Sequence, residues 1–164
     1  MDEHKRSAIH YWYLLAAFLM ILDQITKYLV EQIIVLGDRI PVNGIFNFVH
    51  LQNKGAAFSF LATAGGWQRY FFIGLAIGIS IWLIVSIRRS VSKVEALGYT
   101  LVLGGALGNL SDRFYRGAVV DFLDFYWNTY HWPAFNIADI TIVLGVSAML
   151  YTMKKEAKPS LKAG

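Results

Sequence analysis

Four long apolar runs constrain this chain more than any other feature of its sequence. Each approaches the ~20 residues that a helix needs to cross the hydrocarbon core of a bilayer, and they cover about residues 11–30, 70–87, 96–115 and 134–153. Only 16% of the residues are charged, against about a quarter in ordinary soluble domains. The sequence therefore predicts one integral membrane domain over residues 1–164, mainly α-helical, with four transmembrane helices.

The basic residues indicate how these helices are oriented. Nine of them lie in the N-terminal tail, in the connection after the second run and in the C-terminal tail, namely Lys5, Arg6, Arg88, Arg89, Lys93, Lys154, Lys155, Lys158 and Lys162. The opposite segments hold five, namely Arg39, Lys54, Arg69, Arg113 and Arg116. Because cytoplasmic loops are rich in Lys and Arg, both termini are expected in the cytoplasm and the longer loops, 31–69 and 116–133, outside. The net charge of +4 then reflects membrane topology rather than nucleic-acid binding.

The outer loops do not have the composition of linkers. Phe46, Phe48 and His50 alternate with other residues after an Asn43-Gly44 turn signal, which favours short β structure. Residues 122–132 are rich in Phe, Tyr and Trp, as interfacial segments are. We expect a small periplasmic β-rich cradle and an interfacial segment. Residues 154–164 are expected to form a disordered basic tail.

Two aspartates, Asp121 and Asp139, flank the second outer loop. A carboxylate near a bilayer costs ~3 kcal/mol or more, so such acids are functional candidates. Both should lie near the outer face, where a pair could share a proton and activate water. The helix dipole would favour ionised Asp139, which makes it a candidate base. The structural alternative is a helix cap formed by Asn136 and Asp139, with Asp121 an ordinary interfacial acid.

Other polar residues lie inside or at the ends of the apolar runs. Asp23 and Lys27 have the i, i+4 spacing that places them on one helix face, which favours a structural ion pair. Asn109, Asp112 and Arg113 end the third run. Asp112 or Arg113 could bind a lipid phosphate, or the two could bind each other.

Small residues show a spacing typical of close helix packing. Gly104 and Gly108 have it, and so do Gly74 and Gly78. The functional alternative is that these glycines form a slot for the backbone of a substrate.

The absence of cysteine excludes disulfides, thiolate metal sites and a cysteine nucleophile. The histidines show no metal-ligand spacing, so neither a metal nor a cofactor is expected.

Five segments, taken in order, resemble the motifs of the bacterial lipoprotein signal peptidases, the type II signal peptidases. They are residues 23–27, 53–59, 104–113, 119–122 and 135–139. Taken by themselves, residues 53–59 would be interpreted as a turn, because they lack the glycine pattern of a phosphate-binding loop. The resemblance covers nearly the whole chain.

The resemblance implies an aspartic endopeptidase of the bacterial inner membrane, with its active site near the periplasmic face. It would remove the signal peptide from diacylglyceryl-modified prolipoproteins by cutting on the N-terminal side of the lipidated cysteine. Asp121 and Asp139 would be the catalytic dyad. Residues implied to bind the substrate or support the site are Asp23, Lys27, Asn53, Gly104, Gly108, Asn109, Asp112, Arg113, Asn136 and Ala138. Membrane lipid and the prolipoprotein are the expected partners, globomycin is an expected inhibitor, and a monomer is expected.

Two other function classes stay open at this point. A small proton-coupled transporter or channel would also place acids in membrane helices. Against it, the acids cluster at one face rather than across the bilayer. A non-catalytic membrane adaptor would tolerate the loss of both aspartates.

Overall fold

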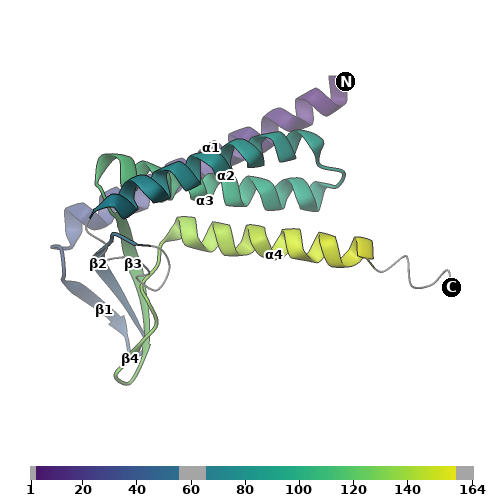
Figure 1. The fold of residues 1–164 in the computed structure, drawn as a ribbon. Helices are drawn as coiled ribbons and strands as arrows, with labels where there is room; N and C mark the ends of the chain where they lie inside the picture. Colours follow the sequence, from purple (N-terminus) through teal and green to yellow (C-terminus); the bar gives the residue numbers. More distant parts are fainter. Residues whose placement is uncertain (1–2, 56–65, 158–164) are drawn as a thin grey trace.

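A computed structural model describes residues 3–55 and 66–157 of the chain. Four helices lie along one another, and a small sheet projects from one end of them (Figure 1). The helices are α1 (Glu3–Ile33), α2 (Trp67–Arg89), α3 (Lys93–Tyr115) and α4 (Ile137–Ala157). The strands are β1 (Arg39–Asn43), β2 (Phe46–Asn53), β3 (Val119–Trp127) and β4 (Tyr130–His131). The predicted fold class, mainly α with a small β-rich part, is confirmed.

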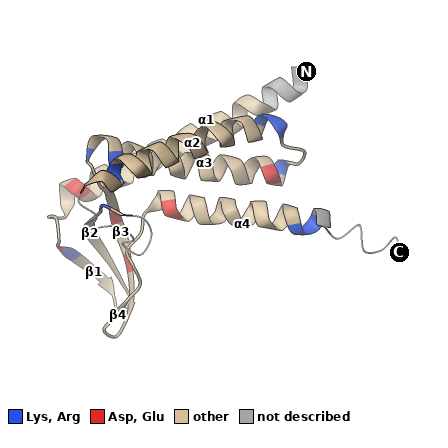
Figure 2. Ribbon diagram, viewed as in Figure 1, with Lys and Arg blue, Asp and Glu red and all other residues tan. Residues whose placement is uncertain are grey.

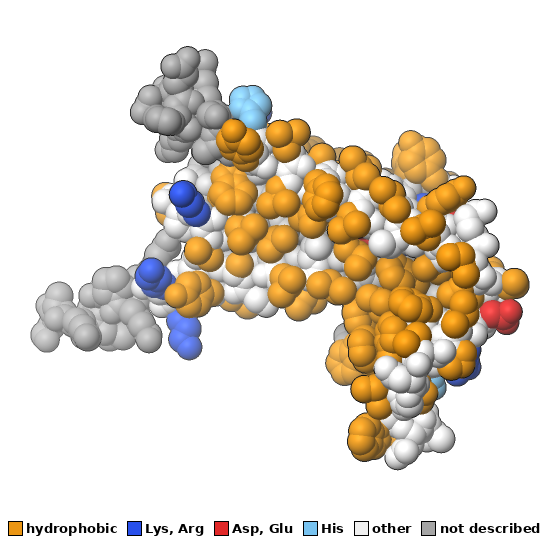
Figure 3. Space-filling model, turned by 180° about the vertical axis from the view of Figure 1, so that it is seen from behind, with side chains coloured by type: hydrophobic (Ala, Val, Ile, Leu, Met, Phe, Trp, Pro, Cys, Tyr) orange, Lys and Arg blue, Asp and Glu red, His pale blue; other side chains and the backbone are white. Residues whose placement is uncertain are grey.

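The outer surface of the helices is apolar. Among the described residues, three helical segments are long and apolar enough to cross a membrane: Ile9–Ile33, Trp67–Arg89 and Ile137–Lys155. Hydrophobic side chains cover the helical part of the surface seen in Figure 3. Helix α3 packs against all three other helices, and its role as the fourth span stays a prediction. Basic residues gather at the α2–α3 turn and near the end of α4, at the end of the bundle far from the sheet (Figure 2).

The C-terminal prediction is partly wrong. Helix α4 does not end at Met153 but continues to Ala157. Lys154 and Lys155 lie in its last turn, where positive charge is favourable for the helix dipole. Residues 158–164 lie outside the described residues.

The sheet is antiparallel in the order β1-β2-β3-β4. Its register places Leu51 of β2 opposite Asp121 of β3. Part of the aromatic 122–132 segment forms β3 and β4, with Trp127 and Tyr130 exposed, so the segment expected to be interfacial belongs to the cradle itself. Its position at a membrane surface stays a prediction.

The two predicted small-residue patterns have opposite outcomes. A Cβ atom at Gly104 would lie 3.0 Å from the carbonyl oxygen of Ala16 in α1, and one at Gly108 would lie 2.5 Å from Asp23 Oδ2. Close packing is therefore confirmed for the α3 pair. For Gly74 and Gly78 it is wrong, because these glycines lie on an exposed side of α2 and a Cβ there would meet no described atom within 4 Å.

The contact between α3 and α4 gives a testable consequence. A Cβ atom at Gly145 would lie 2.6 Å from the carbonyl oxygen of Gly98 and 2.8 Å from the amide nitrogen of Val102. Because these backbone atoms cannot move aside without disturbing the packing of α3 on α4, Gly145→Ala should lower the free energy of unfolding by about 1–3 kcal/mol. Gly74→Ala is the matched control and should be neutral or slightly stabilising. Thermal unfolding of both variants in detergent tests this, and equal melting temperatures would contradict it.

Candidate active site

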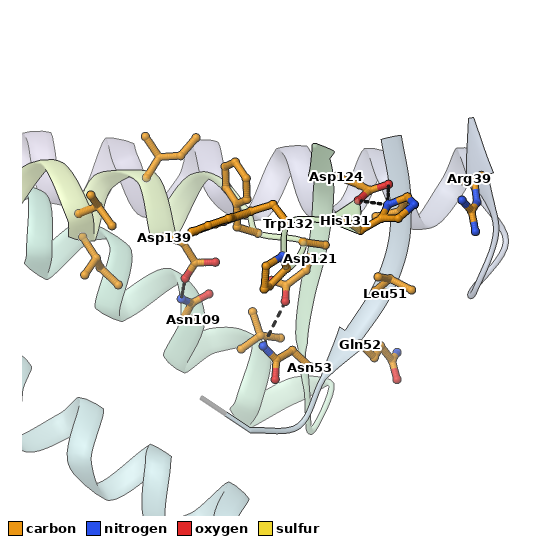
Figure 4. A pocket seen from close by; sticks show the side chains of 18 of the residues that line it. Arg39, Leu51, Gln52, Asn53, Asn109, Asp121, Asp124, His131, Trp132 and Asp139 are labelled. Carbon is orange, nitrogen blue, oxygen red and sulfur yellow. Dashed lines mark hydrogen bonds and ion pairs between the residues drawn. The ribbon is translucent and has the colours of Figure 1, made fainter. Parts of the chain in front are cut away.

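A cavity of about 1150 Å³ lies where the sheet meets the helices. It is lined by residues of β2 and β3, the segment before α4, and the facing parts of α3 and α4 (Figure 4). Five of the sequence-predicted site residues line it: Asn53, Asn109, Arg113, Asp121 and Asp139. The fold thus brings together groups that lie far apart along the chain.

Asp121 and Asp139 approach this cavity from different elements. Asp121 lies in β3 and is 5% exposed, whereas Asp139 lies in the first turn of α4 and is only partly buried. Figure 4 shows the two side chains on facing walls of the same space. Burial, followed by the nearby negative charge of Asp139, raises the pKa of Asp121 to about 7. The arrangement therefore allows a neutral carboxyl group and an ionised one in one site at neutral pH.

Three asparagine amides hold the carboxyl groups. Asp121 accepts from Asn53 Nδ2 at 3.2 Å and from Asn136 Nδ2 at 2.7 Å. Asp139 Oδ1 accepts from Asn109 Nδ2 at 2.9 Å. Each carboxyl group thus has a fixed orientation, supplied by residues of three different elements.

The predicted cap at the start of α4 is also confirmed. The backbone N–H of Asp139 donates to Asn136 Oδ1 at 3.0 Å, and the backbone N–H of Asn136 donates to Asp139 Oδ2 at 3.2 Å. This is a capping box, which satisfies two helix-end donors reciprocally. Asn136 also donates to Asp121 at 2.7 Å, so the residue that caps α4 links the two aspartates.

A fully buried ion network lies behind Asn109. Lys27 Nζ is 2.8 Å from Asp23 Oδ2 and 2.7 Å from Asp112 Oδ2, so the predicted Asp23–Lys27 pair is confirmed. The same ammonium group donates to Asn109 Oδ1 at 3.0 Å. Asn109 therefore links Lys27 on one side to Asp139 on the other. Lys27 does not line the cavity, and its hydrogen-bonded link to Asp139 runs through this amide.

The suggested contact between Asp112 and Arg113 is wrong, because successive helix residues point in different directions. Asp112 is buried and binds Arg116 at 2.9 Å as well as Lys27, which leaves no room for a lipid phosphate. Arg113 donates to the carbonyl oxygen of Gly55 at 2.8 Å and lines the cavity. A phosphate contact of Arg113 stays a prediction.

Residues around the network lock the helices together. The backbone N–H of Ala138 donates to Asp23 Oδ1 at 2.9 Å, which ties the start of α4 to α1. Gly108 allows this approach, because a Cβ there would lie 3.4 Å from the Cβ of Ala138 as well as against Asp23. Asp23, Gly104, Gly108 and Ala138 therefore lie behind the cavity wall rather than on it.

Some residues of the site were missed. Arg116 binds Asp112 and makes a paired contact with Glu31 through Nε and Nη2 at 2.8 and 2.9 Å. Asp124 and His131 form a pair that lines the cavity. Asp112 and Arg116 have the i, i+4 spacing of a helix ion pair, so the sequence did carry a signal for that contact. The contact with Glu31 and the Asp124–His131 pair had no such signal. Within the described ranges, no group of three or more His, Cys, Asp or Glu residues could hold a metal ion.

The segment resembling the second motif is described only in part. Asn53 Oδ1 accepts from the backbone N–H of Gly55 at 3.0 Å, which closes a short turn beside Asp121. Residues 56–59, including Ser59, lie outside the described residues.

Comparisons with known proteins agree with one another. The family profile of signal peptidase (SPase) II matches residues 15–155. A lipoprotein signal peptidase of Serratia marcescens is 58% identical over 123 residues, which are 75% of this chain and 72% of the relative. One of Azoarcus sp. is 47% identical over 154 residues, 93% of this chain and 88% of the relative. A bacterial membrane enzyme solved by the in meso method at 2.3 Å resolution superimposes with a TM-score of 0.81 at 32% identity, covering 91% of this chain and 90% of that one.

Proposed function

Because the chain belongs to the signal peptidase II family of aspartic proteases, we propose that it removes the signal peptide from diacylglyceryl-modified prolipoproteins with Asp121 and Asp139 as its catalytic dyad. The cut falls on the N-terminal side of the lipidated cysteine. The observation that carries the proposal is that both carboxyl groups line one cavity between helices and sheet, each held by asparagine amides.

The two aspartates have different roles. Asp139, ionised at the start of α4, takes a proton from a water molecule, whose oxygen attacks the scissile carbonyl carbon. Asp121, neutral in its buried position, donates to the carbonyl oxygen and stabilises the tetrahedral intermediate. Asp139 then gives its proton to the leaving nitrogen as the C–N bond breaks, and Asp121 recovers its own. The signal peptide leaves with a new carboxyl group and the lipoprotein with a free amino group.

The cavity walls suit a substrate that comes from the membrane. Ile140, Ile142, Val143 and Leu144 of α4 line its helical side, where the apolar end of a signal peptide would lie. Asn109 and Arg113 from α3 face the same space and would hold main-chain groups of the substrate. All of these groups come from one chain, so a monomer suffices, and globomycin would occupy the same cavity. In this proposal the protein lies in the inner membrane with its termini in the cytoplasm and its dyad near the periplasmic face, as the basic residues predict.

The test is cleavage by the purified protein in detergent. A diacylglyceryl-modified prolipoprotein should give a product that mass spectrometry identifies as beginning with the lipidated cysteine, and globomycin should block its formation. The unmodified precursor is the control substrate. Proton flux in liposomes without cleavage of either substrate would instead support the transporter.

The roles of the dyad predict a pH dependence. Because the pKa of Asp121 is raised to about 7, its carboxyl group is neutral below that pH and ionised above it. As a proton donor it is lost when the pH rises, so kcat/KM should fall about tenfold per pH unit above about pH 7. Initial rates at constant ionic strength between pH 5 and 9 check this. A rate that rises steadily to pH 9 would contradict a neutral Asp121.

A further inference from the structure

The cavity contains a further buried acid that the proposed mechanism does not use. Asp124 lies in β3 and is 5% exposed. Asn47 of β2 faces it in the sheet register and donates to Asp124 Oδ2 at 2.8 Å. His131 Nδ1 lies 2.8 and 3.0 Å from the two oxygens of the same carboxylate. Asp124 is therefore a buried and oriented acceptor for a histidine ring.

These contacts fix His131 while leaving part of it accessible. Its ring stacks on Tyr126 at 5.1 Å between centroids and 18° between planes. Since Nδ1 donates to the carboxylate, Nε2 is the polar ring atom left for another partner. The side chain is 40% exposed, and both His131 and Asp124 line the cavity (Figure 4). A fixed ring with a free nitrogen is pre-organised for binding, because little side-chain entropy remains to be lost.

The position of the pair indicates which part of a substrate it meets. The dyad lies between two halves of the cavity. The α4 side is lined by apolar residues, whereas the sheet side adds the polar Arg39, Gln52, Asp124 and His131 to apolar residues such as Val49 and Leu51. The sheet lies at the end of the bundle where α4 begins and extends sideways from it (Figure 1). A signal peptide crosses the membrane, so it would lie along the helices. The chain after the cut would leave over the sheet, where its main-chain groups need hydrogen-bond partners once they are enclosed.

On the basis of the proposed function, we propose that Asp124 and His131 form a binding subsite for the extended main chain that follows the lipidated cysteine. His131 Nε2 accepts from a substrate N–H when the ring is neutral and donates to a substrate carbonyl when the ring is protonated. Asp124 positions the ring. The pair contributes to affinity for the mature part of the lipoprotein and not to bond cleavage.

A purely structural role is the alternative, since the pair also joins β3 to β4. The two roles differ in their dependence on substrate length. If the pair only joins the two strands, its loss should change KM by the same factor for every substrate. A subsite affects only substrates that carry a chain beyond the cysteine.

The experiment therefore uses two substrates with the same signal peptide and the same diacylglyceryl cysteine. The short one stops at that cysteine with a terminal amide, and the long one continues into the mature chain. For the intact protein, KM should be lower for the long substrate. His131→Phe keeps an aromatic ring for stacking but removes Nε2, and should raise KM for the long substrate about fivefold, as expected for one hydrogen bond. Its kcat, and its KM for the short substrate, should not change.

Two further variants complete the test. Asp124→Asn removes the charge that orients the ring and should raise KM only for the long substrate. His10→Phe makes the same chemical change in α1, outside the cavity, and should alter neither constant. Equal KM values of the unmodified protein for both substrates would overturn the proposal, whether or not the variants fold. A rise in KM of the same size for both substrates would also overturn it. If the unmodified protein cleaves neither substrate, the proposed function itself fails.

Discussion

Asp121→Asn and Asp139→Asn are each expected to lower kcat for prolipoprotein cleavage at least about a thousandfold. An amide at position 139 cannot take a proton from water. An amide at position 121 can donate a hydrogen bond but cannot exchange a proton with the reacting oxygen. Both substitutions keep the size of the side chain. Asn53 and Asn136 bind different oxygens of Asp121, so an amide there can accept from only one of them, and the fold of each variant is checked by thermal unfolding.

Asp38→Asn is the matched control for these variants. Asp38 also lines the cavity but is exposed in the turn before β1, away from the asparagine network. Its substitution removes one carboxylate from the same cavity and should leave the rate within about twofold. Single-turnover cleavage of the lipidated substrate, with thermal unfolding to confirm folding, measures all three variants. Substantial activity in either dyad variant would remove that residue from the mechanism.

Lys27→Met is expected to lower the free energy of unfolding by about 3–5 kcal/mol, because it leaves buried carboxylates without their cation. Lys27 is 0% exposed and contacts Asp23 and Asp112 at 2.8 and 2.7 Å. Methionine fills a similar space without charge, so the loss of stability measures the effect of the missing charge rather than that of a cavity. Activity should also fall, because Asn109 loses the partner that orients it toward Asp139.

The double variant Asp23→Asn/Lys27→Met separates charge from packing. It removes the acid that depends most on Lys27, while Asp112 keeps its contacts to Arg116 and Gln24, both at 2.9 Å. Stability should therefore recover by more than half relative to Lys27→Met alone. Urea or thermal unfolding in detergent measures the recovery. A double variant less stable than Lys27→Met would show that the network does not act through unpaired charge.

The features that the sequence predicted correctly depend on neighbours along the chain. The Asp23–Lys27 pair and the Asn136–Asp139 cap span three or four residues of one helix, so spacing alone reveals them. The apolar runs predict the helices in the same way. Composition cannot tell whether a small residue faces a neighbour or the outside, which is why Gly104 and Gly74 show the same spacing but different surroundings.

The missed features depend on which surfaces the fold brings together. Asp112 meets Lys27 only because α1 packs against α3, and the direction of Asp112 could not be read from the adjacent Arg113. The Asp124–His131 pair requires the turn that returns the chain from β3 to β4. The resemblance to a family supplied the dyad. The residues alone left Asp121 and Asp139 open to a structural interpretation.

Detection of the proton on Asp121 is the most direct test of the proposed mechanism, because that mechanism needs a neutral Asp121 beside an ionised Asp139. Infrared difference spectroscopy detects the C=O stretch of a protonated carboxyl group. The intact protein should show such a band at pH 6 that disappears with a midpoint near pH 7, and Asp121→Asn should lack it. A band that persists in Asp121→Asn, or no band at pH 6 in an active enzyme, would contradict the assignment.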